Sequence, residues 1–297
     1  MKIAISACFC SCFIFTLAAG LFAEPWKIDI NANVATTLNS YSDNWTGGEA
    51  GSFTWGSQFL GVAERQLNPK FNTKTTLKMQ FGQTATQDNT SKAWSVPKKS
   101  TDLIDGEELL RYTLDAWVDP FASVRAISEF VDESDSMLTR YGNPLELTEA
   151  IGVSRTLKKS ETAYWSTRVG GAARQLIDRH RLDTATGVRK TRVINDGGVE
   201  FDMDLKLENK RKWTTFLSSL RLYEALISSE ANAEKGTSAE NDWRYPHMKW
   251  ENTLTLTYAK YIMLNVSAYA YFDKDIKSDI RLKETFSVGL TYSYSKK

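Results

Sequence analysis

The sequence is poor in cysteine, and the little it has lies at the start of the chain. Cys8, Cys10 and Cys12 are its only cysteines. All three fall within residues 1–23, which read as a secretory signal with Lys2 at its start, an apolar run and then small residues before Ala23. We therefore predict a signal peptide over 1–23 and a mature barrel domain over 24–297. Without cysteine, that domain has no disulfide framework, thiol catalyst or thiolate metal site.

Long hydrophobic runs, an excess of charge and clusters of histidine are also missing. The mean hydropathy is −0.38 and the formal net charge is +1, which argue against membrane helices and against a nucleic-acid partner. His180 and His247 are the only histidines, and we expect both to be solvated loop residues rather than metal ligands. The sequence predicts no cofactor and no metal.

What the chain does have is alternation of apolar and polar residues. From 248 to 258 one face reads Met, Trp, Asn, Leu, Leu, Tyr while the other carries Lys, Glu and Thr, and 262–272 alternates again after a break at Ala259-Lys260. A period of two marks strands with one apolar face. Each run has the roughly 9 to 11 residues that a tilted strand needs to cross a bilayer.

The same pattern recurs along the mature chain. We predict about twelve strands, an even number as in bacterial single-chain barrels. They centre on residues 28–38, 53–59, 71–81, 110–118, 122–130, 145–157, 163–173, 199–207, 216–226, 248–258, 262–272 and 280–292. The predicted fold is all-β, a single transmembrane antiparallel up-and-down β-barrel.

The predicted connections alternate in length. Short ones lie near Asn68, Asp119, Lys159, Asn209 and Lys260, and long ones span 41–51, 84–106, 132–144, 177–197 and 229–247. Outer-membrane barrels have short periplasmic turns and long extracellular loops. We therefore predict a bacterial outer-membrane protein with both termini in the periplasm. Its expected partners are outer-membrane lipid, periplasmic chaperones and the barrel-assembly machinery.

Aromatic residues fall near the predicted strand ends, as in the interfacial girdles of membrane barrels. We expect one girdle at the periplasmic end and another toward the extracellular end. The first comprises Trp26, Phe71, Trp213, Tyr258, Tyr292 and Tyr294, and the second Trp55, Tyr112, Trp165 and Trp250.

A motif in the first long loop carries a family resemblance. Asn44-Trp45-Thr46-Gly47-Gly48 resembles the Asn-Trp-x-x-Gly-Gly signature of an uncharacterised outer-membrane β-barrel family, a domain of unknown function (DUF3078). That family has no assigned activity, so the resemblance implies no catalytic or binding residue. Trp45 with Gly47 and Gly48 could form an inward constriction or a ligand loop, and a tight structural turn is the alternative.

Charged residues occupy the face that alternation turns inward. The candidate lumen residues are Lys74, Lys78, Arg111, Asp115, Arg125, Glu129, Arg168, Asp202, Asp204 and Arg221, joined by Asp29, Arg174, Lys206, Lys249, Glu251, Arg281 and Lys283. Both signs are present with some cationic excess. A polar channel favouring small anionic solutes is one interpretation, and a lumen filled by paired charges is the other.

Three functions remain open on the sequence. The first is a barrel that passes or binds small hydrophilic solutes, and the second is a non-conducting structural or interaction protein. The third is a hydrolase at the barrel rim, for which Ser228 or Ser238 with His247 would be needed. Four outward positions, Glu149, Glu224, Asn252 and Glu284, interrupt the apolar face and are expected near its extracellular edge, where charge costs little.

Overall fold

The computed structural model describes residues 24–41, 50–88, 90–114, 116–183, 186–231, 235–236, 240–274 and 277–296. The predicted signal peptide, the Asn44–Gly48 motif, Asp115 and Ser238 lie outside these residues.

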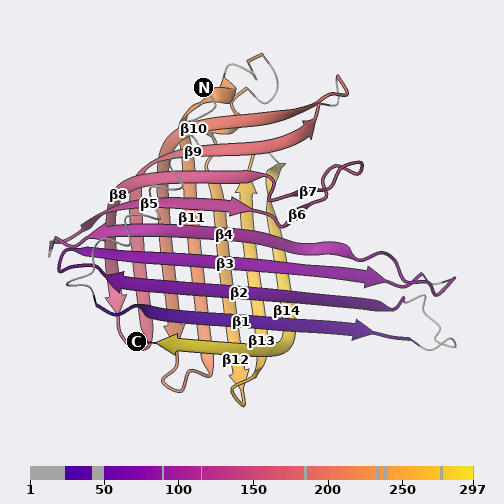
Figure 1. Ribbon diagram of the computed structural model, residues 1–297, viewed down its shortest axis with the longest axis horizontal. Helices are drawn as coiled ribbons and strands as arrows, with labels where there is room; N and C mark the ends of the chain where they lie inside the picture. The colour runs from indigo at the N-terminus through magenta and orange to yellow at the C-terminus, as the bar shows by residue number, and fades with distance from the viewer. Residues whose placement is uncertain are drawn as a thin grey trace.

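Twelve strands form a closed antiparallel barrel in the order β1-β14-β13-β12-β11-β10-β9-β8-β5-β4-β3-β2 (Figure 1). They are β1 Lys27–Asn39, β2 Ser52–Gln66, β3 Phe71–Thr86, β4 Lys98–Tyr112, β5 Asp119–Ser128, β8 Leu145–Lys159, β9 Ala163–Leu182, β10 Arg189–Glu208, β11 Thr214–Ser228, β12 His247–Tyr258, β13 Ile262–Asp273 and β14 Lys277–Lys296. The predicted fold class and strand number are confirmed.

Four small elements of the described chain lie outside the barrel wall. β6 Val131–Asp132 and β7 Arg140–Tyr141 pair as a separate hairpin between β5 and β8. Two 3-10 turns, Ser229–Ala231 and Asp242–Arg244, lie between β11 and β12. Within the described ranges, no helix combines the length and the apolar character that spanning a membrane would take.

The barrel has two unlike ends. Short connections at 67–70, 113–118, 160–162, 209–213 and 259–261 share one end with the start of β1 and the finish of β14, and we call it the short-turn end. The opposite end carries the longer connections and the β6–β7 hairpin, and we call it the long-loop end. The predicted alternation of short and long connections is present.

Two of the predicted loops are strand instead. The fourth strand is Lys98–Tyr112, not 110–118, and the chain turns at 113–118 before β5 begins at Asp119. β9 and β10 continue to Leu182 and from Arg189, so most of 177–197 is paired. The prediction failed for β4 because its lumen face carries Lys99, Asp105 and Glu107, which makes a strand segment look like a polar loop.

Apolar side chains cover the outer surface. Ile151 is 70% exposed, Phe286 68% and Leu282 73%, as expected for residues that face lipid. Trp213, Tyr258 and Tyr292 are exposed at the short-turn end. Tyr112 and Trp165 also lie there, not toward the opposite end, because the fourth strand ends at Tyr112 and β9 starts at Ala163.

Candidate functional site in the charged lumen

Ion pairs cross the lumen at mid-height. Lys78 on β3 pairs with Glu251 on β12, a strand far around the barrel from it. Arg168 Nη2 on β9 lies 2.7 Å from Glu107 Oε1 on β4, again across the interior. Because β3 and β12 lie nearly opposite each other and β5 and β8 separate β4 from β9, both pairs span part of the lumen.

A connected set of charges surrounds these bridges. Arg168 also reaches Asp202 Oδ2 at 2.8 Å, and Arg221 Nη1 lies 3.0 Å from Asp202 Oδ1. Arg125 Nε donates to Asp105 Oδ1 at 2.8 Å. We define the central charge layer as Lys78, Asp105, Glu107, Arg125, Arg168, Asp202, Asp204, Arg221 and Glu251.

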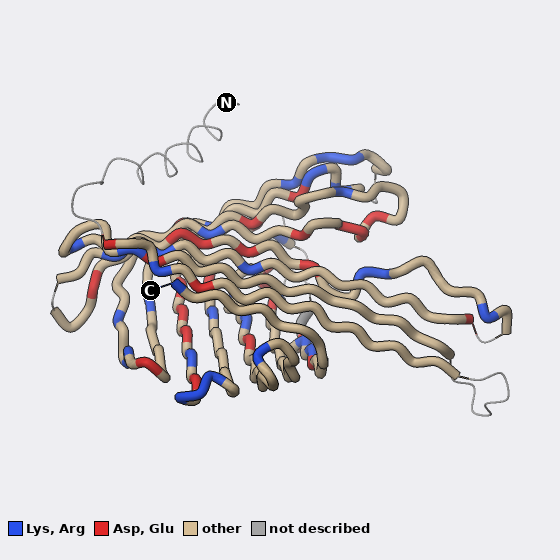
Figure 2. The backbone as a smooth tube through the Cα atoms, turned by 60° about the horizontal axis from the view of Figure 1, so that its bottom comes forward, with Lys and Arg blue, Asp and Glu red and all other residues tan. Residues whose placement is uncertain are grey.

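Side chains at the centre of this layer are buried, so their charges must be paired. The Arg168 side chain is 6% exposed and that of Asp202 7%. Charges removed from water are stable only when they are paired and hydrogen-bonded. The layer carries four cations against five carboxylates, so its charges nearly cancel. Figure 2 shows both signs interspersed along the strands.

The cationic excess expected from the sequence is therefore not found at this level. Asp105 and Glu107 were missed because the sequence suggested a loop before residue 110. Once β4 is placed at Lys98–Tyr112, both carboxylates enter the layer through their pairs with Arg125 and Arg168. The segment Glu107-Glu108-Leu109-Leu110 does not alternate, so the sequence offered no periodic signal for them.

The remaining predicted lumen residues lie above or below this layer. Lys74 Nζ is 5.5 Å from the centre of the Tyr164 ring on β9. Arg111 Nη1 donates to Thr156 Oγ1 at 3.1 Å near the short-turn end. Glu129 pairs with Lys99 toward the long-loop end. The structure therefore spreads the predicted candidates over the height of the barrel.

His247 is not the solvated loop residue expected from the sequence. It begins β12, is 8% exposed, and its Nδ1 lies 3.2 Å from Asp273 Oδ2. Its Nε2 is 3.5 Å from Arg174 Nη2. Burial follows because His247 pairs with Tyr223 in the wall. Its two ring nitrogens thus face Asp273 and Arg174, which favours an ion-pair role in the wall over the base of a rim hydrolase.

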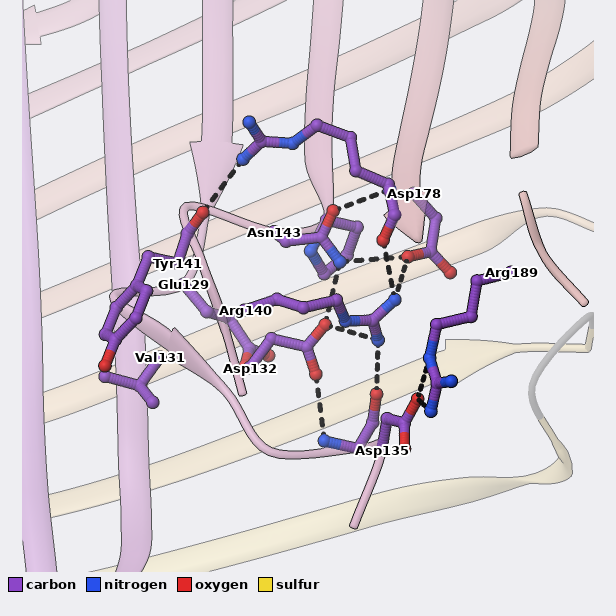
Figure 3. Close-up of polar contacts among 12 residues, drawn as sticks. Glu129, Val131, Asp132, Asp135, Arg140, Tyr141, Asn143, Asp178 and Arg189 are labelled. Atoms are coloured by element: carbon purple, nitrogen blue, oxygen red, sulfur yellow. Dashed lines mark hydrogen bonds and ion pairs between the residues drawn. The ribbon is translucent and has the colours of Figure 1, made fainter. Parts of the chain in front are cut away.

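A second polar network lies outside the lumen at the long-loop end (Figure 3). Arg140 of β7 contacts Asp132 at 2.6 Å and Asp178 of β9 at 2.9 Å. Asn143 is fully buried and donates to both carboxylates, at 2.8 and 2.9 Å. Arg189 of β10 reaches Asp135 at 2.8 Å. These contacts dock the β6–β7 hairpin on the extended β9–β10 hairpin.

The acidic groups of this network are held in their charged form. Burial of Asp132 opposes ionisation, but hydrogen bonds from Asn143 and Ser134 together with Arg140 leave its pKa below the usual value. The pKa of Asp135 is lowered first by the backbone N–H of Met137 and then by Arg189. The docking is therefore intact at neutral pH.

Of the four outward polar positions, Glu149 lies on β8 and Glu224 on β11, and the other two share one row. Asn252 of β12 and Glu284 of β14 both pair with Ala268 of β13. A further outward carboxylate, Glu108, accepts hydrogen bonds from the Thr73 and Thr75 hydroxyls. Within the described residues no group of carboxylates and histidines could hold a metal ion.

Solved structures with similar folds are membrane barrels. An outer membrane channel from Pseudomonas putida F1 matches with a TM-score of 0.43 and 13% identity, covering 93% of this chain and 98% of that one. The translocator domain of autotransporter NalP from Neisseria meningitidis matches with a TM-score of 0.38 and 9% identity, covering 97% of each chain. A search of curated proteins found no match.

The family comparison concerns the N-terminal part of the barrel. Residues 24–133 match the family described as "Protein of unknown function (DUF3078)". That region contains the Asn44-Trp45-Thr46-Gly47-Gly48 motif. The resemblance to this uncharacterised family that the motif suggested is therefore confirmed over residues 24–133.

Proposed function

We propose that this protein is an outer-membrane barrel that is closed to free ion flow at rest and acts by binding rather than as an open pore. The observation that carries the proposal is the central charge layer. Lys78–Glu251 joins opposite walls and Glu107–Arg168 joins β4 to β9 across the interior, and a permeating ion would have to separate these pairs to pass.

A small-solute channel is the second candidate, and one observation favours it. The side chains of Lys78 and Glu251 each keep 23% exposure, so space remains beside this bridge. If that bridge opened, the passage would be lined by charges of both signs and would select weakly between cations and anions.

Conductance in a planar bilayer distinguishes the two candidates. The mature chain, residues 24–297, should insert without discrete conductance steps. The double variant Lys78→Ala with Glu251→Ala should produce steps, because it removes the bridge between opposite walls. The matched control is Lys27→Ala with Glu24→Ala, an exposed ion pair at the short-turn end, which should remain silent. Steady conductance by the unmodified chain, equal to that of the double variant, would overturn the closed-barrel proposal.

A further inference from the structure

The wall of the barrel is incompletely paired where its first and last strands meet. β1 and β14 pair from Ile28 with Lys296 to Ala35 with Gly289, and no further. β14 pairs with β13 over Arg281–Leu290, so it changes partner near Gly289. Figure 1 shows β14 running beside β13 and then curving to follow β1 toward the C-terminus.

Two strand edges are left open above this point, and we call the gap the β1–β14 seam. Thr36–Asn39 of β1 still pair with β2 on their other side. Residues 281–288 of β14 have a strand partner only on β13 within the described chain. At the last pair the two backbones are in close contact, since a Cβ on Gly289 would lie 2.2 Å from the carbonyl oxygen of Val34.

An open edge at this position is unusual for a membrane barrel. Leu282, Phe286 and Val288 on β14 are 73%, 68% and 51% exposed, so the segment lies within the lipid-facing surface. Unpaired backbone groups in hydrocarbon are costly, and closed barrels normally have none. An unpaired wall segment is tolerated where it borders a polar cavity.

A polar cavity reaches the unpaired segment of β14, because Lys283 of that segment is one of its lining residues. It has a volume of about 290 Å³ and is lined by residues from β3, β4, β13 and β14, among them Gln80, Lys99, Asp102, Tyr269, Tyr271 and Lys283. The Tyr269 and Tyr271 rings are nearly parallel, 3° apart, with centroids separated by 6.3 Å. The Tyr271 hydroxyl donates to Glu251 Oε1 at 3.1 Å, so the central charge layer adjoins the cavity.

The cavity contains one cation that the protein does not neutralise. Lys99 is paired with Glu129 and lies 3.5 Å from Asp102. Lys283 Nζ donates to the Ser100 carbonyl oxygen at 3.3 Å, and no carboxylate of the described chain lies within ion-pair distance of it. Lys283 belongs to the unpaired segment of β14, so the charge sits at the seam.

We propose that this cavity binds a small amphipathic monocarboxylate, which reaches it from the lipid through the β1–β14 seam. The carboxylate would pair with Lys283 Nζ, and the apolar body would lie against the Tyr269 and Tyr271 rings. A single unpaired lysine matches a single negative charge. The volume is near the lower end of ligand sites, which span about 300 to 1,000 Å³, and favours a small acid over a whole lipid. The proposal does not depend on whether the lumen conducts.

Benzoate binding in a neutral detergent tests the site. Saturation-transfer NMR on the folded mature barrel should show benzoate bound and the uncharged analogue benzamide bound at least ten-fold more weakly. Lys283→Gln should weaken benzoate binding at least ten-fold. Lys260→Gln is the matched control, because its Nζ also lies over a tyrosine ring, Tyr261 at 5.4 Å, but in a turn at the short-turn end. Failure of benzoate to bind, or equal binding by the Lys283→Gln variant, would overturn the proposal.

Labelling tests the route. Residues 24–297 contain no cysteine, so one cysteine can be placed on β1 and coupled to a bulky maleimide. A label at Thr36→Cys, beside the open edge, should slow benzoate association at least ten-fold. The same label at Ala32→Cys, on the part of β1 that pairs with Tyr292, should not. Equal rates for the two labelled proteins would exclude the seam as the entrance.

Discussion

Strand pairing stops early at several places toward the long-loop end, among them one side of β4 and one side of β14. β4 pairs with β5 over Ile104–Arg111 only, so Lys98–Leu103 has no strand on that side. β14 likewise lacks a strand beside residues 281–288 on the side of β1. In an aqueous protein both would be ordinary frayed edges, but in a membrane wall each needs a substitute for the missing hydrogen bonds.

Only the first of these edges is sealed by side chains. The Asp102 carboxylate accepts the backbone N–H groups of Phe130 at 2.7 Å and Val131 at 2.9 Å. Lys99 donates to the Val131 carbonyl oxygen at 2.6 Å. At the β1–β14 seam, no side-chain hydrogen bond between described residues joins Thr36–Asn39 to β14. The difference indicates that the chain can close such a gap and does not do so at the seam.

The largest expected effect comes from breaking the sealed edge. Asp102→Ala leaves two backbone N–H groups without their acceptor and removes a carboxylate from Lys99. Because hydrogen bonds to a charged group contribute about 1.5–3 kcal/mol each, we expect the free energy of unfolding to fall by about 3 kcal/mol. Urea unfolding in phospholipid vesicles measures this change. Glu161→Ala, at an exposed position in the 160–162 turn, should leave the midpoint unchanged, and equal midpoints for both variants would refute the sealing role.

Disulfide formation between β1 and β14 reports how far apart the two strands lie at the open edge. A cysteine pair at Thr36→Cys and Val288→Cys continues the β1–β14 register beyond its last pair, while Ala32→Cys with Tyr292→Cys lies within it. Disulfides require Cα atoms roughly 4.4–6.8 Å apart. We expect the second pair to oxidise at least ten-fold faster, as followed by gel mobility. Similar rates would mean that the seam is closed in the membrane.

Acid should release the hairpin next to the sealed edge. The lowered pKa values of Asp132 and Asp135 mean that docking contributes fully above the unfolded aspartate pKa of about 3.9. That contribution is lost as the pH falls through the lower folded values. Hydrogen exchange, corrected for its intrinsic rate, measures the protection of β6 and β7. Protection should be constant between pH 5 and pH 8, roughly the range of maximal stability. It should weaken in stronger acid. Protection that declines already near neutral pH would contradict this assignment.

The smallest effect on stability is expected at the start of β1, at the short-turn end of the barrel. Lys27 Nζ lies 3.5 Å from Glu24, and both side chains are more than half exposed, at 55% and 56%. Exposed ion pairs typically contribute about 0–1 kcal/mol, so Lys27→Ala should leave the urea midpoint nearly unchanged. A large loss of stability would show that the start of β1 depends on this ion pair rather than on its backbone hydrogen bonds to neighbouring strands.

The sequence was most informative where one strand face is apolar. The Met248 to Phe272 hairpin was predicted almost to its ends, because Trp250 and Leu254 alternate with charged and hydroxyl residues and only Ala259-Lys260 interrupts them. β4 was misplaced because it has polar residues on both faces near Asp102, so periodicity could not separate it from a loop. The long reach of β9 and β10 was missed for the same reason near Arg179 and Arg181.

The sequence by itself determined the all-β class, the number of strands and the sorting of short and long connections, and it predicted the export signal. These features follow from local composition and from a period of two residues. Only the tertiary structure decided which charges meet. Lys78 and Glu251 are far apart in the chain, and their pairing depends on how a closed sheet brings opposite walls together. The seam was likewise decided by tertiary structure, because the partner of each half of β14 depends on the stagger between strands.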